Sequence, residues 1–180
     1  MMQKNLLMIT KSTPKDEILK LAPDCTCHHC SHGCTIGSGF LAEDDYGALA
    51  ELLGISVEEL KEKHLEEANL FNKALHRPKL NRKKGMPFGS CTFFNRKEER
   101  CSVHAAKPLQ CRVSMGCKEY GEQLQQWFML NHLIDFSNPE SIRQYAQYLK
   151  AGGKTIHGGG LSELVPDMEF LKKVLDYEIV

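Results

Sequence analysis

Apolar residues along this chain recur mainly at the spacing of an α-helix, and residues that start or stop helices lie beside them. Thr13 followed by Pro14 is a capping residue before a first-turn proline, so a short helix should begin there and end near Pro23. Within Glu43–Leu53 the apolar residues again have helical spacing, and Gly54 follows where a helix stops. These signals predict two helices.

The middle of the chain combines one helix signal with signals for turns and strands. Ser56, with Glu59 three residues later, forms a capping box, which predicts a helix that runs into the 70s and ends before the next proline. Residues 78–87 are basic and typical of turns, so we expect an exposed connection. Two short apolar or β-branched pieces, Thr92–Phe94 and Ser102–His104, flank a charged turn and predict a small β-hairpin.

The stretch after residue 117 is predicted to be purely helical. Asn138 and Pro139 cap a helix through Leu149, and Pro166 can open a last helix that ends near Tyr177. An apolar stripe precedes these helices, formed by Leu124, Trp127, Phe128, Leu130 and Ile134. Such a stripe is typical of a buried core rather than of a cofactor-binding surface.

The segment Ala151–Gly160 contains five glycines. Its Gly-Gly-Lys-Thr piece is similar to part of a phosphate-binding loop. That loop needs a glycine five positions before Gly153 and a preceding strand, whereas the chain has Tyr148 there and no predicted strand. We therefore expect a flexible connection.

The formal net charge is zero, which gives no global reason to expect nucleic acid or an anionic membrane as a partner. Locally, Lys73–Arg100 has nine basic residues and two glutamates, an excess of seven positive charges. Such a stretch can steer a phosphate-bearing partner, and its alternative interpretation is a solvated loop. No apolar run approaches the roughly 18 residues of a membrane span.

Eight cysteines occur in two groups with a long cysteine-free stretch between them. The first group is Cys25, Cys27, Cys30 and Cys34, and the second is Cys91, Cys101, Cys111 and Cys117. A metal needs several soft ligands from a few short loops, and thiolate is the form that binds it. The Cys-x-x-Cys spacing of Cys27 and Cys30 lets one tight turn present two sulfurs to one centre. All eight cysteines are therefore candidate metal ligands.

Disulfides and incidental buried thiols are the competing explanations, and eight cysteines can pair in about 105 ways. Residues 1–10 lack the longer apolar core and small-residue cleavage site of a secretory signal, and a chain of this length can bury an ordinary core without covalent staples. We therefore expect a cytoplasmic, reducing setting and zinc or iron as the cofactor. Eight sulfurs would satisfy two tetrahedral zinc sites, or one four-iron cluster with cysteines to spare.

Histidines near the cysteines make a mixed sulfur and nitrogen site chemically reasonable. They are His28, His29 and His32 in the first group and His104 in the second. A supporting or merely exposed role is the alternative for each. Thioredoxin-like redox catalysis by Cys27 and Cys30 needs a strand-to-helix setting on a parallel sheet, and the sequence predicts none.

The length fits one domain over residues 1–180. Residues 20–118 are expected to form the cysteine-cluster metal-binding region. Residues 119–180 are expected to form a helical cover for it, because some 60 residues make a marginal core alone. The predicted fold class is mainly α with a small β-hairpin, an irregular helical domain organised around a cysteine-ligated metal centre.

Two runs of sequence carry a resemblance to a known family. Cys-His-His-Cys-Ser-His-Gly-Cys at 27–34, followed by residues 39–45 and 52–56, resembles the opening of the YkgJ-type cysteine-cluster proteins, described as a zinc- or iron-chelating domain. Residues 91–94, 100–104 and 107–112 are similar to that family's second half in order and spacing. The resemblance covers roughly residues 25 to 112. The chain departs from the family in having Lys107 where an arginine is usual.

The resemblance implies a cytoplasmic metal-binding protein in which residues of both groups ligate a common centre. The cysteines that match are Cys27, Cys30, Cys101 and Cys111. Arg112 follows Cys111 and can donate hydrogen bonds to thiolates, so it is a candidate cofactor-binding residue, with an ordinary surface arginine as the alternative. Two other functions stay open. They are an iron-sulfur enzyme, oxidoreductase or methylase-like, and a zinc-stapled nucleic-acid adaptor that uses the basic stretch.

Overall fold

The computed structural model describes residues 8–22, 25, 28–114 and 119–177. Within these residues the chain forms nine α-helices, one short 3-10 helix, one π-helix and three two-stranded antiparallel sheets. The predicted class, mainly α with a small β component, is confirmed. In the described ranges, every helix is too short or too polar to cross a bilayer.

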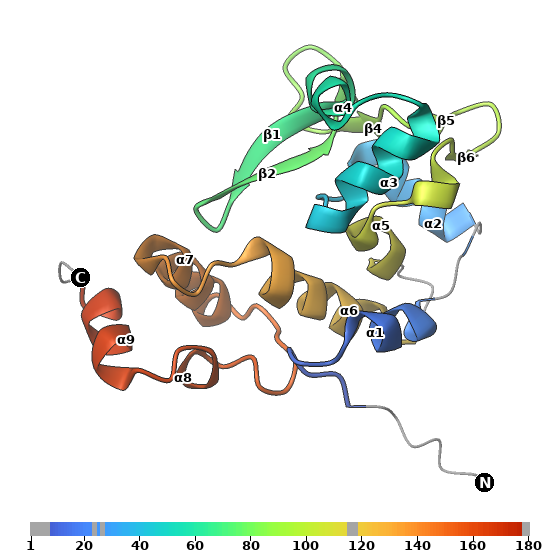
Figure 1. The fold of residues 1–180 in the computed structure, drawn as a ribbon. Helices are drawn as coiled ribbons and strands as arrows, with labels where there is room; N and C mark the ends of the chain where they lie inside the picture. The colour runs from blue at the N-terminus through green and yellow to red at the C-terminus, as the bar shows by residue number, and fades with distance from the viewer. Residues whose placement is uncertain (1–7, 23–24, 26–27, 115–118, 178–180) are drawn as a thin grey trace, which may run out of the picture.

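The elements form two groups in space (Figure 1). The upper group holds all the strands together with α2 (His28–Ile36), α3 (Glu43–Leu53), α4 (Val57–His64), η1 (His104–Ala106) and α5 (Leu109–Val113). Its sheets pair β1 (Leu65–Leu70) with β2 (Lys73–Pro78), β3 (Leu80–Arg82) with β4 (Gly89–Cys91), and β5 (Phe94–Asn95) with β6 (Arg100–Cys101). The lower group holds α1 (Lys15–Leu21), α6 (Gly121–Phe128), η2 (Met129–Leu133), α7 (Pro139–Lys150), α8 (Leu161–Leu164) and α9 (Met168–Leu175).

Helix ends that carry a local signal lie where the sequence places them. Helix α3 ends at Gly54, whose φ of 66° is the left-handed conformation typical of a helix stop. The Ser56 hydroxyl accepts the Glu59 amide N–H at the start of α4. The Asn138 side chain accepts two amide N–H groups at the start of α7. Capping groups near in sequence thus determine these boundaries.

The prediction that the helix after Ser56 runs into the 70s is wrong. Helix α4 ends at His64, and β1 and β2 follow as a hairpin in which Leu65 pairs with Pro78. The connecting residues Phe71 and Asn72 have φ of 51° and 55°, as a two-residue type I′ turn requires. Phe71 adopts this unfavourable conformation because its ring is buried against Tyr145 and Tyr148.

Other boundaries also differ from the prediction. Pro14, not Thr13, is the N-cap of α1, and the Thr13 hydroxyl instead accepts the Thr10 amide N–H at 2.9 Å. The connection expected over 78–87 contains strand β3, although residues 81–88 are exposed. The predicted small hairpin is present as β5 and β6 and is displaced by about two residues. Helix α8 was not predicted from the sequence.

The glycine-rich connection between α7 and α8 is held by side chains of α7. The Tyr145 hydroxyl donates to the carbonyl oxygen of Gly159 at 2.7 Å, and the Tyr148 hydroxyl donates to that of Lys154 at 2.8 Å. Because a helix precedes this segment, the strand that a phosphate-binding loop needs is absent from this described part of the chain.

The segment before α1 is fastened to elements far away in sequence. The indole N–H of Trp127 donates to the carbonyl oxygen of Thr13 at 2.9 Å, and the Asn131 side chain donates to that of Lys11 at 3.0 Å. Thr10 forms an isolated parallel bridge with His157. The N-terminal segment therefore lies within the lower group of helices (Figure 1).

The largest apolar core joins the two groups of elements. Ile18 and Trp127 of the lower group pack in one cluster with Leu75 and Leu109 of the upper group. The predicted stripe is buried here, since Leu124, Trp127, Phe128, Leu130 and Ile134 are each at most 5 % exposed. A second cluster lies entirely in the upper group, among α3, α4 and the strands, and includes Cys91.

Candidate metal centre

The first cysteine group is carried mainly by α2. Cys30 and Cys34 are four residues apart in this helix, so their side chains lie on one face. Cys25 precedes the helix, and its carbonyl oxygen lies 3.3 Å from His104 Nε2. Cys27 lies outside the described residues.

The second group comes from three separate elements. Cys91 ends β4, where it pairs with Leu80, and Cys101 ends β6, where it pairs with Phe94. Cys111 lies in the short helix α5. Cys117 lies outside the described residues. Strand pairing and helix packing thus bring these three thiols from well-separated positions in the chain to the region of α2.

Backbone amides point at three of these sulfurs. The N–H groups of Phe93 and Phe94 donate to Cys91, that of Val103 donates to Cys101, and that of Gly39 donates to Cys111. Each donor stabilises the charged form of the sulfur and orients its lone pairs. This arrangement suits a thiolate that serves as a metal ligand.

Burial acts in the opposite direction on the same thiols. It raises the pKa of Cys91 and of Cys111 to about 12, and it also raises the pKa of Cys34 and Cys101. Nearby thiols add to the rise in the pKa of Cys91, Cys101 and Cys111, because two thiolates close together repel each other. A bound cation reverses the balance, since it favours deprotonated sulfur.

Four thiols are neighbours in this region. Cys34 and Cys101 pack against the apolar cluster that contains Cys91. Charge on Cys34 acts on Cys91, Cys101 and Cys111, so Cys34 is the common neighbour. No three Cys, His, Asp or Glu side chains in the described ranges lie close enough to hold one metal ion. The thiols are therefore gathered without being arranged around a single point.

Two of the cavities beside these thiols are lined by cysteines of both groups. The larger, about 290 Å³, is called here the thiol pocket and is lined by Cys30, Cys34, Cys111, Lys107, Gln110 and the loop after α2. A smaller crevice is lined by Cys25, Cys30, Cys34, Cys101, His104 and Lys107. His104 thus lies among the cysteines, whereas the side chain of His32 is exposed. The side chains of His28 and His29 are not described.

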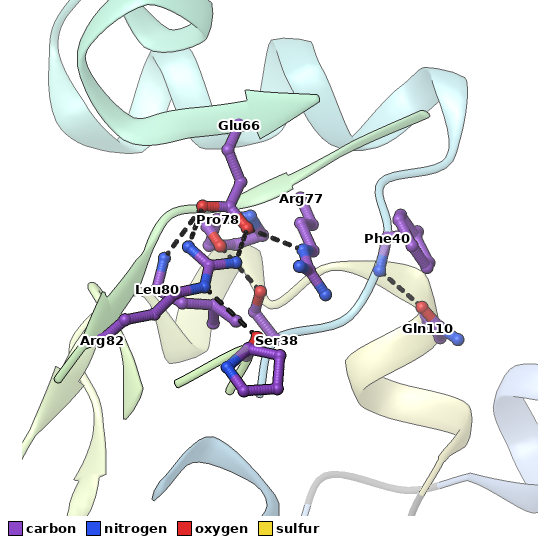
Figure 2. A network of polar contacts seen from close by, with 9 residues as sticks. Ser38, Phe40, Glu66, Arg77, Pro78, Leu80, Arg82 and Gln110 are labelled. Atoms are coloured by element: carbon purple, nitrogen blue, oxygen red, sulfur yellow. Dashed lines mark hydrogen bonds and ion pairs between the residues drawn. The ribbon is translucent and has the colours of Figure 1, made fainter. Parts of the chain in front are cut away.

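The loop after α2 is fixed by polar contacts on both sides (Figure 2). The Ser38 hydroxyl donates to the carbonyl oxygen of Pro78 at 2.7 Å, and the Phe40 N–H donates to the side-chain oxygen of Gln110. Leu41 N–H donates to the carbonyl oxygen of His76 at 2.9 Å. The loop is therefore held between strand β2 and helix α5, next to Cys111.

Glu66 on β1 braces the strands against which this loop rests (Figure 2). Its carboxylate accepts from Arg77 Nε at 2.9 Å and from Arg82 Nη1 at 2.6 Å. The hydrogen bond from Arg82 is the main reason why the pKa of Glu66 falls to about 2. The ionised carboxylate therefore ties β1, β2 and β3 together.

Arg112, predicted to bind the cofactor, lies in α5 directly after Cys111 and is half-buried. It is not among the described residues that line the thiol pocket or the crevice. Lys107 lines both cavities, and Gly39 lies against Cys111. Neither residue was predicted from the sequence to have a role at the site. The sequence does contain one signal for Lys107. The family that the chain resembles usually has an arginine, which is also a cation, at this position.

One of three comparisons with known proteins found a match. The family model CxxCxxCC, "Putative zinc- or iron-chelating domain", matches residues 26–129, more than half of the chain. The chain belongs to this family, and the YkgJ-type resemblance is confirmed. No curated protein and no solved structure matches the chain.

Proposed function

We propose that this protein binds zinc or iron through cysteines of both groups. One observation carries the proposal: four thiols delivered by α2, β4, β6 and α5 are neighbours, and backbone N–H groups donate to three of them. The first candidate ligands are Cys34, Cys91, Cys101 and Cys111. Further candidates are Cys25, Cys27, Cys30 and Cys117, of which Cys27 and Cys30 belong to the family match. Soft thiolates of this kind suit zinc, iron and iron-sulfur clusters.

Each part of the chain has a defined task in this proposal. A bound cation supplies the positive charge that keeps the buried sulfurs deprotonated. The amides of Gly39, Phe93 and Val103 orient the sulfurs. The apolar cluster around Cys91 keeps water from the back of the site. Because the ligands come from distant segments, metal binding should also stabilise the fold.

The redox state of the thiols is relevant to the cellular compartment in which the protein functions. Cys34, Cys91, Cys101 and Cys111 take part in no disulfide within the described residues. Thiolate ligands need to stay reduced, so the proposal includes a reducing compartment such as the cytoplasm.

A second candidate function is an iron-sulfur enzyme, and the thiol pocket favours it. Cys30, Cys34 and Cys111 lie in the wall of an open cavity of about 290 Å³, large enough for a small substrate. A purely structural metal site is closed on all sides. The nucleic-acid adaptor is less favoured, because Arg77 and Arg82 of the basic stretch are engaged by Glu66.

Elemental analysis with protein quantitation on anaerobically purified full-length protein tests the proposal. We expect bound zinc or iron, and visible absorption would identify an iron-sulfur cluster. Cys91→Ser and Cys111→Ser should lower both the metal content and the thermal stability. Ser114→Ala is the control, because this exposed residue lines the thiol pocket without offering a sulfur.

The proposal fails if the purified protein contains neither metal and takes up neither from solution. It also fails if the metal content is unchanged in serine variants of all eight cysteines. Variants of Cys27, Cys30, Cys101 and Cys111 test the ligand set that the family resemblance implies.

A further inference from the structure

Lys107 is a buried cation between the two cavities of the candidate metal centre. Only 9 % of the residue is exposed, and it lines both the thiol pocket and the crevice. It lies between η1 and Pro108, so the backbone around it is fixed by the turn that leads into α5. Its amine nitrogen is not one of the fully buried, unpartnered side-chain atoms of the described residues, so it still reaches the solvent in these cavities.

An ammonium group that is largely screened from water interacts strongly with negative charge nearby. Three sulfurs of the candidate centre are near enough to Lys107 for this interaction. Burial raises the pKa of Cys34, Cys101 and Cys111, and the positive charge of Lys107 opposes the rise at all three. Among the described residues, no carboxylate lines the thiol pocket, whereas Glu99 lines the crevice together with Lys107.

We propose that Lys107 is the charge partner of the metal-thiolate centre. Three or four thiolates bring more negative charge than a divalent ion neutralises, and the Lys107 ammonium offsets part of that excess. This inference rests on the proposed function and names a residue, outside the cysteines, that sets how tightly the centre holds its metal. Lys107 does not ligate the metal, so its effect is purely electrostatic.

The proposal predicts that Lys107 matters mainly when metal is bound. Lys107→Met keeps the apolar stem and removes the charge, so the thermal stability of the metal-free variant should stay close to that of the parent. With metal bound, the same change leaves excess negative charge uncompensated, so zinc should bind roughly 10 to 100-fold more weakly. A side chain that served only to fill space would change both forms in the same direction.

The test uses full-length protein, stripped of metal under reducing conditions and titrated with zinc against a chromophoric chelator. Thermal unfolding is measured with and without zinc. Lys107→Arg should keep the parent affinity within a few-fold, because it keeps the charge. Lys107→Gln repeats the test with a neutral polar side chain if the methionine variant does not fold. Lys154→Met, which removes an exposed lysine paired with Glu122, is the control and should match the parent.

Parent-like zinc affinity in both neutral variants would overturn the inference, as would a metal-free variant that is less stable than the parent. A parent protein that binds neither zinc nor iron overturns the proposed function, and this inference with it. If the parent binds zinc and the neutral Lys107 variants bind it equally tightly, the inference about Lys107 is overturned and the proposed function stands.

Discussion

Gly39 lies directly against Cys111, and the absence of a side chain at Gly39 leaves room for the sulfur. A Cβ atom at position 39 would lie 2.7 Å from Cys111 Sγ and 3.2 Å from the Cys111 backbone nitrogen. The Gly39 N–H also donates to that sulfur. The glycine is therefore required for a close approach between the loop after α2 and the second cysteine group.

Gly39→Ala should disturb the candidate metal centre while leaving the distant helices unchanged. The added methyl group must push Cys111 or the loop aside, which should cost about 1 to 3 kcal/mol of unfolding free energy and lower zinc retention. Gly37→Ala is the matched control, because a Cβ there has no neighbour within 4 Å among the described residues. Equal denaturation midpoints and equal zinc affinities for the two variants would contradict the prediction.

Glu66 should make the stability of the upper group depend on pH in the acid range. Its pKa lies near 2 in the folded protein, below the ordinary value of 4.5, so the folded state binds fewer protons than the unfolded state between these values. The stabilisation is therefore complete above about pH 4.5 and is lost as the pH falls toward 2. Glu66→Gln should lower the unfolding free energy by about 1 to 3 kcal/mol at pH 7, and the difference should shrink toward pH 2.

Denaturant unfolding at several pH values measures this effect. Glu67→Gln provides the control, because Glu67 is an exposed neighbour on the same strand. A difference between Glu66→Gln and the parent that is constant from pH 7 to pH 2 would rule out the Glu66 carboxylate as its source.

Arg112→Ala tests the predicted role of the arginine beside Cys111. If its guanidinium supports a thiolate ligand, the variant should lose zinc roughly 10 to 100-fold more readily in a chelator challenge. Arg100→Ala is a suitable comparison, since Arg100 precedes Cys101 but is exposed and paired with Glu98 at 2.6 Å. Parent-like retention in Arg112→Ala would identify it as a residue without a role at the metal.

A fragment that ends at Lys118 tests whether residues 119–180 cover the cysteine-bearing part. Leu75 and Leu109 share a core with Leu124 and Trp127, so removal of the later helices would expose an apolar face. We expect the fragment to aggregate and to lose metal, as judged by size-exclusion chromatography and elemental analysis. A monomeric fragment with the metal content of the full-length protein would show that the C-terminal segment is an independent appendage.

Local signals account for the parts of the fold that the sequence predicted well. Gly54 ends α3 and Asn138 begins α7, because a cap acts on residues only a few positions away. The β1 and β2 hairpin escaped prediction because its turn places Phe71 at positive φ, which the residue type does not favour. Burial of that ring against residues of α7, far along the chain, compensates for the local cost.

The candidate site likewise has features that the sequence predicts and features that depend on contacts between distant residues. Grouped cysteines are visible in the sequence, because a metal-binding loop concentrates its ligands. Which thiols become neighbours depends on strand pairing and helix packing, and these bring Cys91 close to Cys34 across the chain. Lys107 and Gly39 matter through burial and close approach, which no local spacing encodes.

The fastening of the N-terminal segment has a consequence for the order of events during synthesis. Lys11 is held by Asn131, 120 residues later, so this contact cannot form until the ribosome has released most of the chain. At about 5 to 20 residues per second, the interval is roughly 6 to 24 s. The first cysteine group is made early in that interval and the second group near its end, so both precede the helices that complete the main core. Metal capture by a growing chain would therefore precede closure of the fold, and a thiol-protecting chaperone has its best opportunity in this interval.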